Sequence, residues 1–136
     1  MKKQFCIAIV IVAVLLLTAG MTSAAKLPNL VGTWSGGIHF VGWNSAADPQ
    51  FYYASYVFTY EIENQDPATG NFYGHESGYP FTGNVSTNKV VTIIEYETAG
   101  EYRIITGKVS GKKITGTMQH WKPDQVDTGT FVLEKQ

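Results

Sequence analysis

Residues 105–118 read ITGKVSGKKITGTM, and this stretch carries one apolar-Thr-Gly-x-apolar motif on each side of a short turn. Within each copy, apolar residues and glycine recur at every second position, which is the period of a β-strand that buries one face. The Gly111-Lys112 pair between the copies suits a two-residue hairpin loop. The stretch therefore predicts two antiparallel strands with a shared buried side.

The same motif occurs again at residues 81–85, and looser copies begin at Val31 and Thr128. Turn residues interrupt the chain about every ten positions, as in all-β sandwiches and barrels. Strands are predicted at residues 31–41, 51–63, 71–77, 80–86, 89–97, 101–109, 113–121 and 128–135. Glycine on the buried face of a strand often marks a bend that lets a sheet curl into a barrel. The expected fold is therefore all-β, a single antiparallel up-and-down barrel of eight strands.

Three short turns set the expected register, provided that residues 87–88, 99–100 and 111–112 are all two-residue hairpin loops. These turns predict the cross-strand pairs Val85–Val90, Gly83–Thr92, Phe81–Ile94, Ile94–Ile105, Tyr96–Arg103, Val109–Ile114, Ile105–Met118 and Arg103–His120. A slip of one residue would turn every side chain of a strand to the other face. Because the three turns place the same residues on one face, they favour a single buried side.

The buried face is predicted to be apolar at one end and polar at the other. The apolar end is expected to collect Trp34, Ile62, Phe72, Val85, Val90, Val109, Ile114 and Leu133. The polar end is expected to collect Tyr56, Glu76, Phe81, Tyr96, Arg103 and His120, with Phe40 nearby and Asp127 opposite His120. Charged groups are rarely buried unless they are paired or face a water-filled cavity. Two interpretations therefore stay open: a satisfied Arg103–Glu76 pair inside a capped barrel, or a ligand pocket at this end.

The pocket interpretation defines a set of candidate ligand-binding residues. They are Phe40, Tyr56, Glu76, Phe81, Tyr96, Arg103 and His120. Aromatic walls with a few convergent polar groups are typical of small-molecule sites. The expected ligand is small and partly apolar, and an anionic group on it would suit Arg103, the only arginine of the chain.

Two other functions use the same region. An acid–base enzyme of isomerase or lyase type would employ His120 as the base and Arg103 as the anion holder. A protein-interaction module would employ Phe51, Tyr53 and Trp43, aromatic residues that need not face the core. Binding of a small molecule is favoured over catalysis, and no catalytic residue is assigned.

The first 25 residues have the order of a secretion signal. Lys2 and Lys3 precede an apolar run over residues 5–17, and small residues lead to a cleavage site at Ser23-Ala24-Ala25 or Thr22-Ser23-Ala24. The apolar run is shorter than the roughly 20 residues needed to span a bilayer. The mature domain is therefore expected to comprise residues 26–136 and to be secreted or held in the cell envelope or periplasm. Contact with a membrane is expected only through the signal before cleavage.

Composition argues against several classes of function. The single cysteine, Cys6, lies in the signal, so neither disulfides nor a cysteine nucleophile are expected in the domain. His39, His75 and His120 lack the close spacing of a metal motif, and no metal or other cofactor is expected. Ten Lys and Arg against eleven Asp and Glu form no basic cluster, so nucleic acid is not an expected partner. Residues 84–86 form an N-glycosylation sequon on the outward face.

The predicted first strand opens with Gly32-Thr33-Trp34, preceded by Leu27-Pro28-Asn29-Leu30, which has the character of a helical turn. This resembles the Gly-x-Trp start of lipocalins and avidins, the calycin barrels. The resemblance implies an eight-stranded antiparallel meander in which Trp34 plugs the closed end and ligands enter the opposite end. It does not extend to biotin, because residues 35–38 lack the Asn-x-x-x-Ser pattern that avidins use. The domain at residues 26–136 is thus expected to be a calycin-like barrel.

Overall fold

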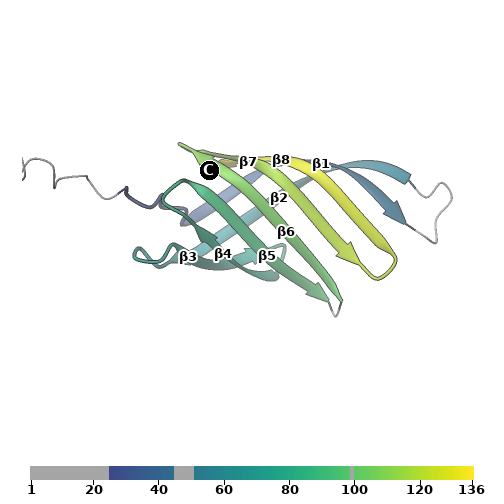
Figure 1. The fold of residues 1–136 in the computed structure, drawn as a ribbon, viewed down its shortest axis with the longest axis horizontal. Coiled ribbons are helices and arrows are strands. Elements are labelled where there is room, and N and C mark those ends of the chain that lie inside the picture. The colour runs from purple at the N-terminus through teal and green to yellow at the C-terminus, as the bar shows by residue number, and fades with distance from the viewer. Residues whose placement is uncertain (1–24, 45–50, 99) are drawn as a thin grey trace, which may run out of the picture.

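The computed structural model describes residues 25–44, 51–98 and 100–136. Eight antiparallel strands follow one another around a closed barrel, in which β1 pairs with both β2 and β8 (Figure 1). The strands are β1 (Gly32–Asn44), β2 (Phe51–Gln65), β3 (Asn71–Glu76), β4 (Tyr79–Val85), β5 (Val90–Thr98), β6 (Glu101–Ser110), β7 (Lys113–Lys122) and β8 (Gln125–Lys135). The predicted fold class, an all-β up-and-down barrel, is confirmed.

The predicted secretion signal occupies the N-terminus of the chain. Residues 1–24, which hold most of the predicted secretion signal, lie outside the described ranges, so the signal stays a prediction. In the part of the chain that is described, no helix is long and apolar enough to cross a membrane.

One end of the barrel is closed by the segment before β1, which meets the left-hand end in Figure 1. Trp34 is 1% exposed, and its indole Nε1 donates a hydrogen bond to the Leu30 carbonyl over 2.7 Å. The side chain of Gln65 accepts from the Leu30 N–H and donates to the Pro28 carbonyl. Trp34 is therefore buried at the apolar end as predicted, and the segment before it packs there without the helical turn expected at residues 27–30.

Glycine in the repeated motif makes room inside the barrel. A Cβ atom added at Gly107 would lie 2.8 Å from the Phe131 ring and 2.9 Å from the Thr115 carbonyl oxygen, closer than real Cβ atoms approach other heavy atoms. Phe131 is buried in the core, so the missing side chain is what lets this ring pack against β6. The predicted role of the motif, inward glycines beside inward aromatic rings, is confirmed at this position.

The register between β6 and β7 is as predicted, but the register between β4 and β5 is not. Val85 pairs with Val91, and Phe81 pairs with Glu95 in place of Ile94. The reason is the loop: Ser86 and Val90 hydrogen-bond across three residues, of which Lys89 has a φ of 64°. A left-handed residue at this position is usual in three-residue hairpin loops.

The slip turns one set of side chains outward. Val90, predicted in the apolar end, is exposed at its surface, and Ile94 also faces outward, whereas Val91 and Ile93 are buried. Tyr96, predicted in the polar end, is 64% exposed and therefore lies on the outside. Glu95 takes the inward place that the sequence interpretation gave to Tyr96.

A bulge in β5 completes this correction. Thr98 pairs with Glu101, as a two-residue loop requires, but the register shifts between Tyr96 and Thr98. Beyond the shift Glu95 pairs with Arg103, so the predicted Tyr96–Arg103 pair is wrong. Bulges commonly re-aim a side chain in this way. Here the bulged residue is Glu97, whose carboxylate reaches Arg103.

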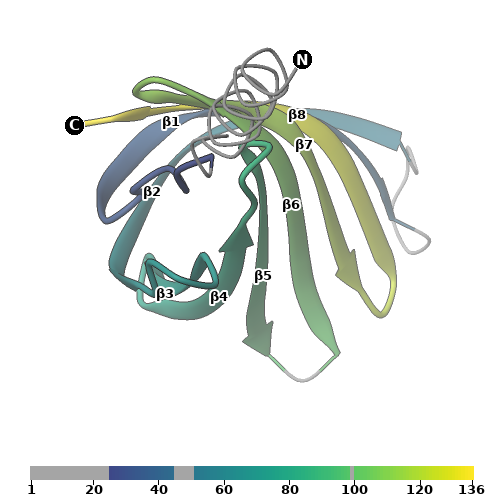
Figure 2. The ribbon, with the colours of Figure 1, turned by 60° about the vertical axis from the view of Figure 1, so that its left-hand side comes forward.

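The barrel wall is uneven at the polar end, because β3 and β4 are shorter than their neighbours (Figure 2). Residues 51–59 of β2 pair with β1 alone, since β3 joins only at Tyr60. On the other side, β4 pairs with β5 only as far as Glu95. Among the described residues, the first half of β2 and the end of β5 therefore have no paired strand between them, and we call this interruption of the pairing the notch.

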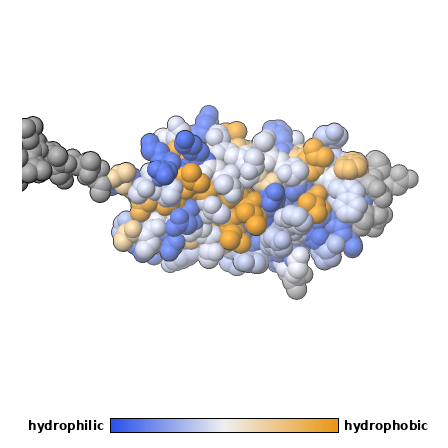
Figure 3. All heavy atoms as spheres, viewed as in Figure 1, coloured by the Kyte–Doolittle hydropathy of each residue, from blue (hydrophilic) through white to orange (hydrophobic). Residues whose placement is uncertain are grey.

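The outside of the barrel is mixed in character. Apolar side chains on the face shown in Figure 3 form separate patches among polar ones. Tyr53 is 83% exposed, and Phe51, Val57 and Trp43 are also exposed. The prediction that Phe51, Tyr53 and Trp43 lie outside the core is confirmed.

Candidate functional site

The polar end of the barrel holds a cavity of about 240 Å³. One wall is aromatic and comes from β1 and β2: Phe40, Tyr52, Tyr56 and Phe58. The facing wall is ionisable and comes from β5 to β8: Glu97, Arg103, His120, Lys122 and Asp127. The two walls meet across the notch, because Tyr56 and Phe58 lie on one flank of it and Glu97 on the other.

The aromatic wall is built by alternation along β2, which turns every second residue inward. The rings of Phe40 and Tyr56 stack with centroids 5.5 Å apart, and Tyr52 meets Phe40 edge-on at 6.3 Å. Deeper in the barrel the Phe58 ring lies 4.8 Å from the guanidinium carbon of Arg103. Tyr56 remains more than half exposed, so it forms the rim of the cavity.

Arg103 is buried and contacts three carboxylates. Its Nη1 lies 3.1 Å from Glu95 Oε2 and 3.6 Å from Glu76 Oε2, and its Nη2 contacts Glu97 Oε1. Of the two interpretations of the polar end, the Arg103–Glu76 ion pair is present, but Glu95 and Glu97 join it. The guanidinium fork is therefore engaged by groups of the protein itself.

The carboxyl group of Glu95 has a pKa well above that of an ordinary glutamate. Burial raises the pKa of its carboxyl group to about 8, and the attraction of Arg103 only partly offsets this. The nearby Glu76 and Glu97 carboxylates raise the pKa further. Although Glu95 lies at ion-pair distance from Arg103, desolvation outweighs that attraction, and the carboxyl group is mainly protonated at neutral pH.

His120 lies between carboxylates on both sides of its ring. Its Nδ1 is 3.3 Å from Asp127 Oδ2, and its Nε2 is 3.1 Å from Glu101 Oε1. Burial lowers the pKa of His120, and the positive charge of Arg103 lowers it further. Asp127 faces His120 across β7 and β8 as predicted, and the Tyr52 hydroxyl donates a hydrogen bond to it.

Glu101 contacts two residues of the ionisable wall, His120 and Lys122. The Lys122 ammonium lies 2.5 Å from Glu101 Oε1, and the Thr98 hydroxyl donates to Glu101 Oε2 over 2.9 Å. The hydrogen bond from Lys122 lowers the pKa of Glu101 to about 2. Glu101 is thus ionised at all ordinary pH values, and the side chain of its partner Lys122 is about one-third exposed.

One group of side chains has a donor set that metal ions accept. Ligand atoms of Glu97, Glu101 and His120 lie within 4.8 Å of one another. A histidine nitrogen with two carboxylates suits zinc and related ions. However, Arg103 already contacts Glu97 and Lys122 already contacts Glu101, so positive side chains occupy both carboxylates.

The structure separates the predicted site residues into three groups. Phe40, Tyr56, Arg103 and His120 line the cavity. Glu76 and Phe81 are buried behind it, where Glu76 contacts Arg103 and Phe81 packs against Tyr60. Tyr96 lies on the outer face, for the reason given above.

Several lining residues escaped the sequence interpretation. Glu97 was missed because of the β5 register, and Lys122 was assigned to a turn. Glu101, which contacts Lys122, was placed at the start of the predicted strand 101–109 without a role in the site. Tyr52, which donates a hydrogen bond to Asp127, was not among the predicted site residues. The available signal was the spacing of Glu95 and Glu97, which places both carboxylates on one face of a strand.

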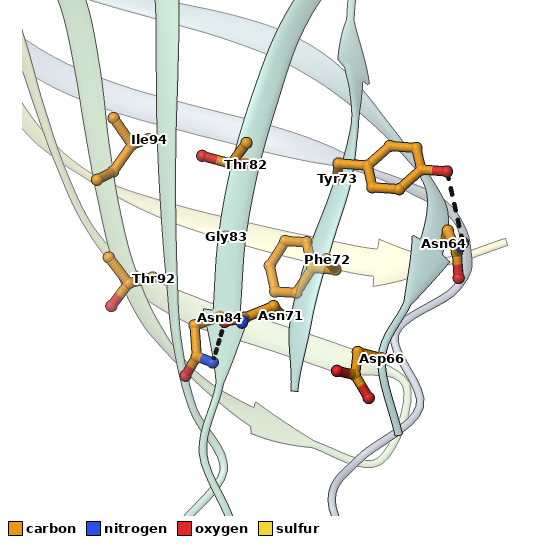
Figure 4. A pocket seen from close by; sticks show the side chains of 10 residues that line it. All are labelled: Asn64, Asp66, Asn71, Phe72, Tyr73, Thr82, Gly83, Asn84, Thr92 and Ile94. Atoms are coloured by element: carbon orange, nitrogen blue, oxygen red, sulfur yellow. Dashed lines mark hydrogen bonds between the residues drawn. The ribbon is translucent and has the colours of Figure 1, made fainter. Parts of the chain in front are cut away.

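A second depression, of about 570 Å³, lies on the outside of the barrel over β3, β4 and β5 (Figure 4). Its polar groups are mainly amides and hydroxyls that bond to one another. The Asn84 amide donates to Asn71 Oδ1 over 2.8 Å and to the Thr69 carbonyl over 3.0 Å. Asn84, the sequon asparagine, is exposed as predicted, but its side-chain N–H groups are engaged.

Neither known protein families nor curated protein sequences match this chain. The fold nevertheless defines a structural class: an eight-stranded antiparallel up-and-down barrel with the general shape of the calycin barrels. Within that class the chain has a closed apolar end and a polar end with a cavity.

Proposed function

We propose that this protein is an exported calycin-like barrel that binds a small, partly apolar molecule at its polar end. The observation that carries the proposal is the cavity of about 240 Å³ between an aromatic and an ionisable wall. Small-molecule sites combine these features, an apolar lining with a few polar groups that orient the ligand. The lysine-led apolar N-terminus supports export.

The positions of Trp34 and of the cavity, at opposite ends of the barrel, support the comparison with calycin barrels. The first strand starts with Gly32-Thr33-Trp34, and Trp34 is buried at the end opposite to the cavity. This is the arrangement that the resemblance implied. The cavity lies slightly below the usual range of about 300–1,000 Å³ for ligand pockets. We therefore infer a ligand with one ring or a short chain.

The polar contacts of such a ligand are best supplied by the rim. Arg103 is engaged by Glu76, Glu95 and Glu97, so an anionic ligand would have to displace one of these carboxylates. Breaking a buried ion pair is costly, because it leaves a charge without its partner. Arg103 is therefore better suited to a structural role in the cavity wall than to binding an anionic ligand.

Binding can be tested by thermal melts of the purified protein with a library of small aromatic and aliphatic metabolites. A ligand at a hundred times its Kd stabilises the folded state by about 2.7 kcal/mol and shifts the melting temperature by several degrees. Tyr56→Ala should abolish the shift, because it removes half of the stacked Phe40–Tyr56 pair. Tyr73→Ala is the matched control, since Tyr73 is also about half exposed but lies in the outer depression. No shift with any compound, or a shift that depends on Tyr73, would contradict the proposed site.

An acid–base enzyme is the second candidate. It is favoured by the position of His120 in the cavity wall, where Asp127 at Nδ1 and Glu101 at Nε2 would orient the imidazole for proton transfer. In that case His120→Gln would stop conversion of a bound compound while its affinity changed little. If the protein only binds, mass spectrometry should recover every bound compound unchanged from both wild type and variant.

A further inference from the structure

The charges around the cavity do not balance. Among the described residues, the carboxylates in this network are Glu76, Glu95, Glu97, Glu101 and Asp127. The permanent cations that contact them are Arg103 and Lys122. Protonation of Glu95 removes one negative charge, yet the remaining four carboxylates still outnumber the two cations.

His120 does not supply the missing charge at neutral pH, because burial favours its neutral form. The carboxylates concerned are poorly accessible: the side chains of Glu76, Glu97, Glu101 and Asp127 are all less than one-fifth exposed. Buried charges are normally paired, and a cleft that carries one sign of charge concentrates ions of the opposite sign. The cavity is therefore electrostatically suited to a cation.

Lys122 shows where a cation fits. Its ammonium group sits 2.5 Å from Glu101 Oε1, and its side chain is about one-third exposed. Lysine has a flexible stem, and its ammonium group is stable when fully hydrated. The side chain can thus swing into solvent and leave its place beside Glu101 to the ammonium group of a ligand.

The opposite wall suits the rest of such a ligand. Phe40 and Tyr56 present stacked rings at the rim, and Phe58 lies deeper, where it already accepts a guanidinium group against its face. Aromatic faces attract organic cations and also bury apolar carbon. The two walls therefore offer complementary contacts, carboxylates for the charge and rings for the body.

We propose that the ligand of this cavity is a small organic amine, bound in its ammonium form between Glu97, Glu101 and Asp127 on one side and Phe40 and Tyr56 on the other. This inference rests on the proposed function and specifies its ligand class. It replaces the expectation of an anionic ligand, which was based on Arg103 being free.

The effect of ligand charge is tested with three probes of similar size and shape: the cationic 2-phenylethylamine, the neutral 2-phenylethanol and the anionic 3-phenylpropionate. Each is titrated into the purified protein by calorimetry at pH 7. The amine should bind at least tenfold more tightly than the alcohol, because only the amine carries a positive charge that can pair with the carboxylates of Glu97 and Glu101. The carboxylate should bind most weakly of the three.

Substitution of Lys122 provides the sharper test. Lys122→Met removes the internal ammonium that competes for Glu101, so affinity for the amine should rise severalfold while affinity for the alcohol stays nearly constant. Lys113→Met is the matched control, because Lys113 pairs with Glu134 at the other end of β7 and should leave both affinities unchanged. Glu97→Gln should lower affinity for the amine about tenfold, with thermal melts confirming that the variant is folded.

The outcomes distinguish the inference from the proposed function. If the alcohol or the carboxylate binds as tightly as the amine, and Tyr56→Ala abolishes this binding, the inference of an amine ligand is overturned. The cavity would still be the binding site. A fall in amine affinity in Lys122→Met also overturns the inference. Binding of Zn²⁺ without binding of the amine would make the site a metal site and overturn it as well. If neither the probes nor the metabolite library bind, both the inference and the proposed function fail.

Discussion

The Glu95 carboxylate lies 3.1 Å from Nη1 of Arg103, at directly paired positions of β5 and β6. Both side chains are almost completely buried. Glu95 Oε1 and Arg103 Nε are buried without a hydrogen-bond partner. The two side chains therefore use only some of their polar atoms in hydrogen bonds. Because Glu95 is mainly protonated at neutral pH, the ion pairs on which stability at this end depends are those of Arg103 with Glu76 and Glu97.

Arg103→Met is expected to destabilise the protein by about 3–5 kcal/mol, the usual cost of removing one partner from a buried charge pair. The reason is that Glu76 and Glu97 would stay buried without the guanidinium group that now contacts both of them. Chemical denaturation monitored by tryptophan fluorescence measures the change. A loss below about 1 kcal/mol would show that these carboxylates do not depend on Arg103.

The matched control is Lys113→Met, which removes a cation from an exposed ion pair with Glu134. Exposed pairs contribute about 0–1 kcal/mol, so this variant should be nearly as stable as wild type. Both variants replace a cation with methionine. The difference between their losses of unfolding free energy therefore reports how much burial strengthens the dependence on the cation.

The sequence predicted the hairpin of β6 and β7 correctly, because Gly111 gives its turn a recognisable residue and adopts a φ of 60°. The β4–β5 loop places Lys89 in the same left-handed region, and nothing in the sequence distinguishes this lysine from an ordinary one. The apolar pattern did not determine the register of β5 either, because Val90-Val91 and Ile93-Ile94 put apolar residues on both faces of the strand.

The candidate site was predictable in location but not in chemistry. The β6–β7 register placed Arg103 next to His120, and the β8 strand brought Asp127 opposite, as expected. The bulge at Glu97 is a local departure that no pairing rule reveals, and it brings a further carboxylate to Arg103. A shift of one residue thus changed the expected site from one that would take an anion to one rich in carboxylates.

Trp34→Ala is expected to cost about 3–5 kcal/mol, as large truncations in a core do. The variant would lose the packing of the closed end together with the hydrogen bond to Leu30. Urea denaturation followed by circular dichroism measures the loss. Trp121→Ala serves as control: Trp121 is partly exposed on the outer face, where it stacks on Tyr102, so its loss should cost less than half as much. Equal costs would argue against Trp34 as the plug.

Export predicts a specific mature N-terminus. When the full chain is expressed in a secreting host, intact-mass analysis of the exported protein should find a start at Ala25 or Lys26. The physical reason is the small-residue site at residues 23–25, which signal peptidases recognise after an apolar run. Recovery of the uncleaved chain in the membrane fraction would instead indicate that residues 5–17 act as an anchor.

The last prediction concerns the pH dependence of stability. Burial raises the pKa of Glu95 from 4.5 to about 8, so between these values the folded state binds a proton that the unfolded state has lost. The stability that Glu95 contributes is therefore fully present below about pH 4.5 and is lost as the pH rises through about 8. Glu95→Gln keeps the shape of the protonated carboxyl group but cannot ionise. The difference in unfolding free energy, variant minus wild type, should then grow steadily from pH 5 to pH 8, whereas Glu134→Gln, an exposed control, should give a flat difference. A constant difference for Glu95→Gln would mean that Glu95 is ionised throughout this range and that the excess negative charge of the cavity is larger by one.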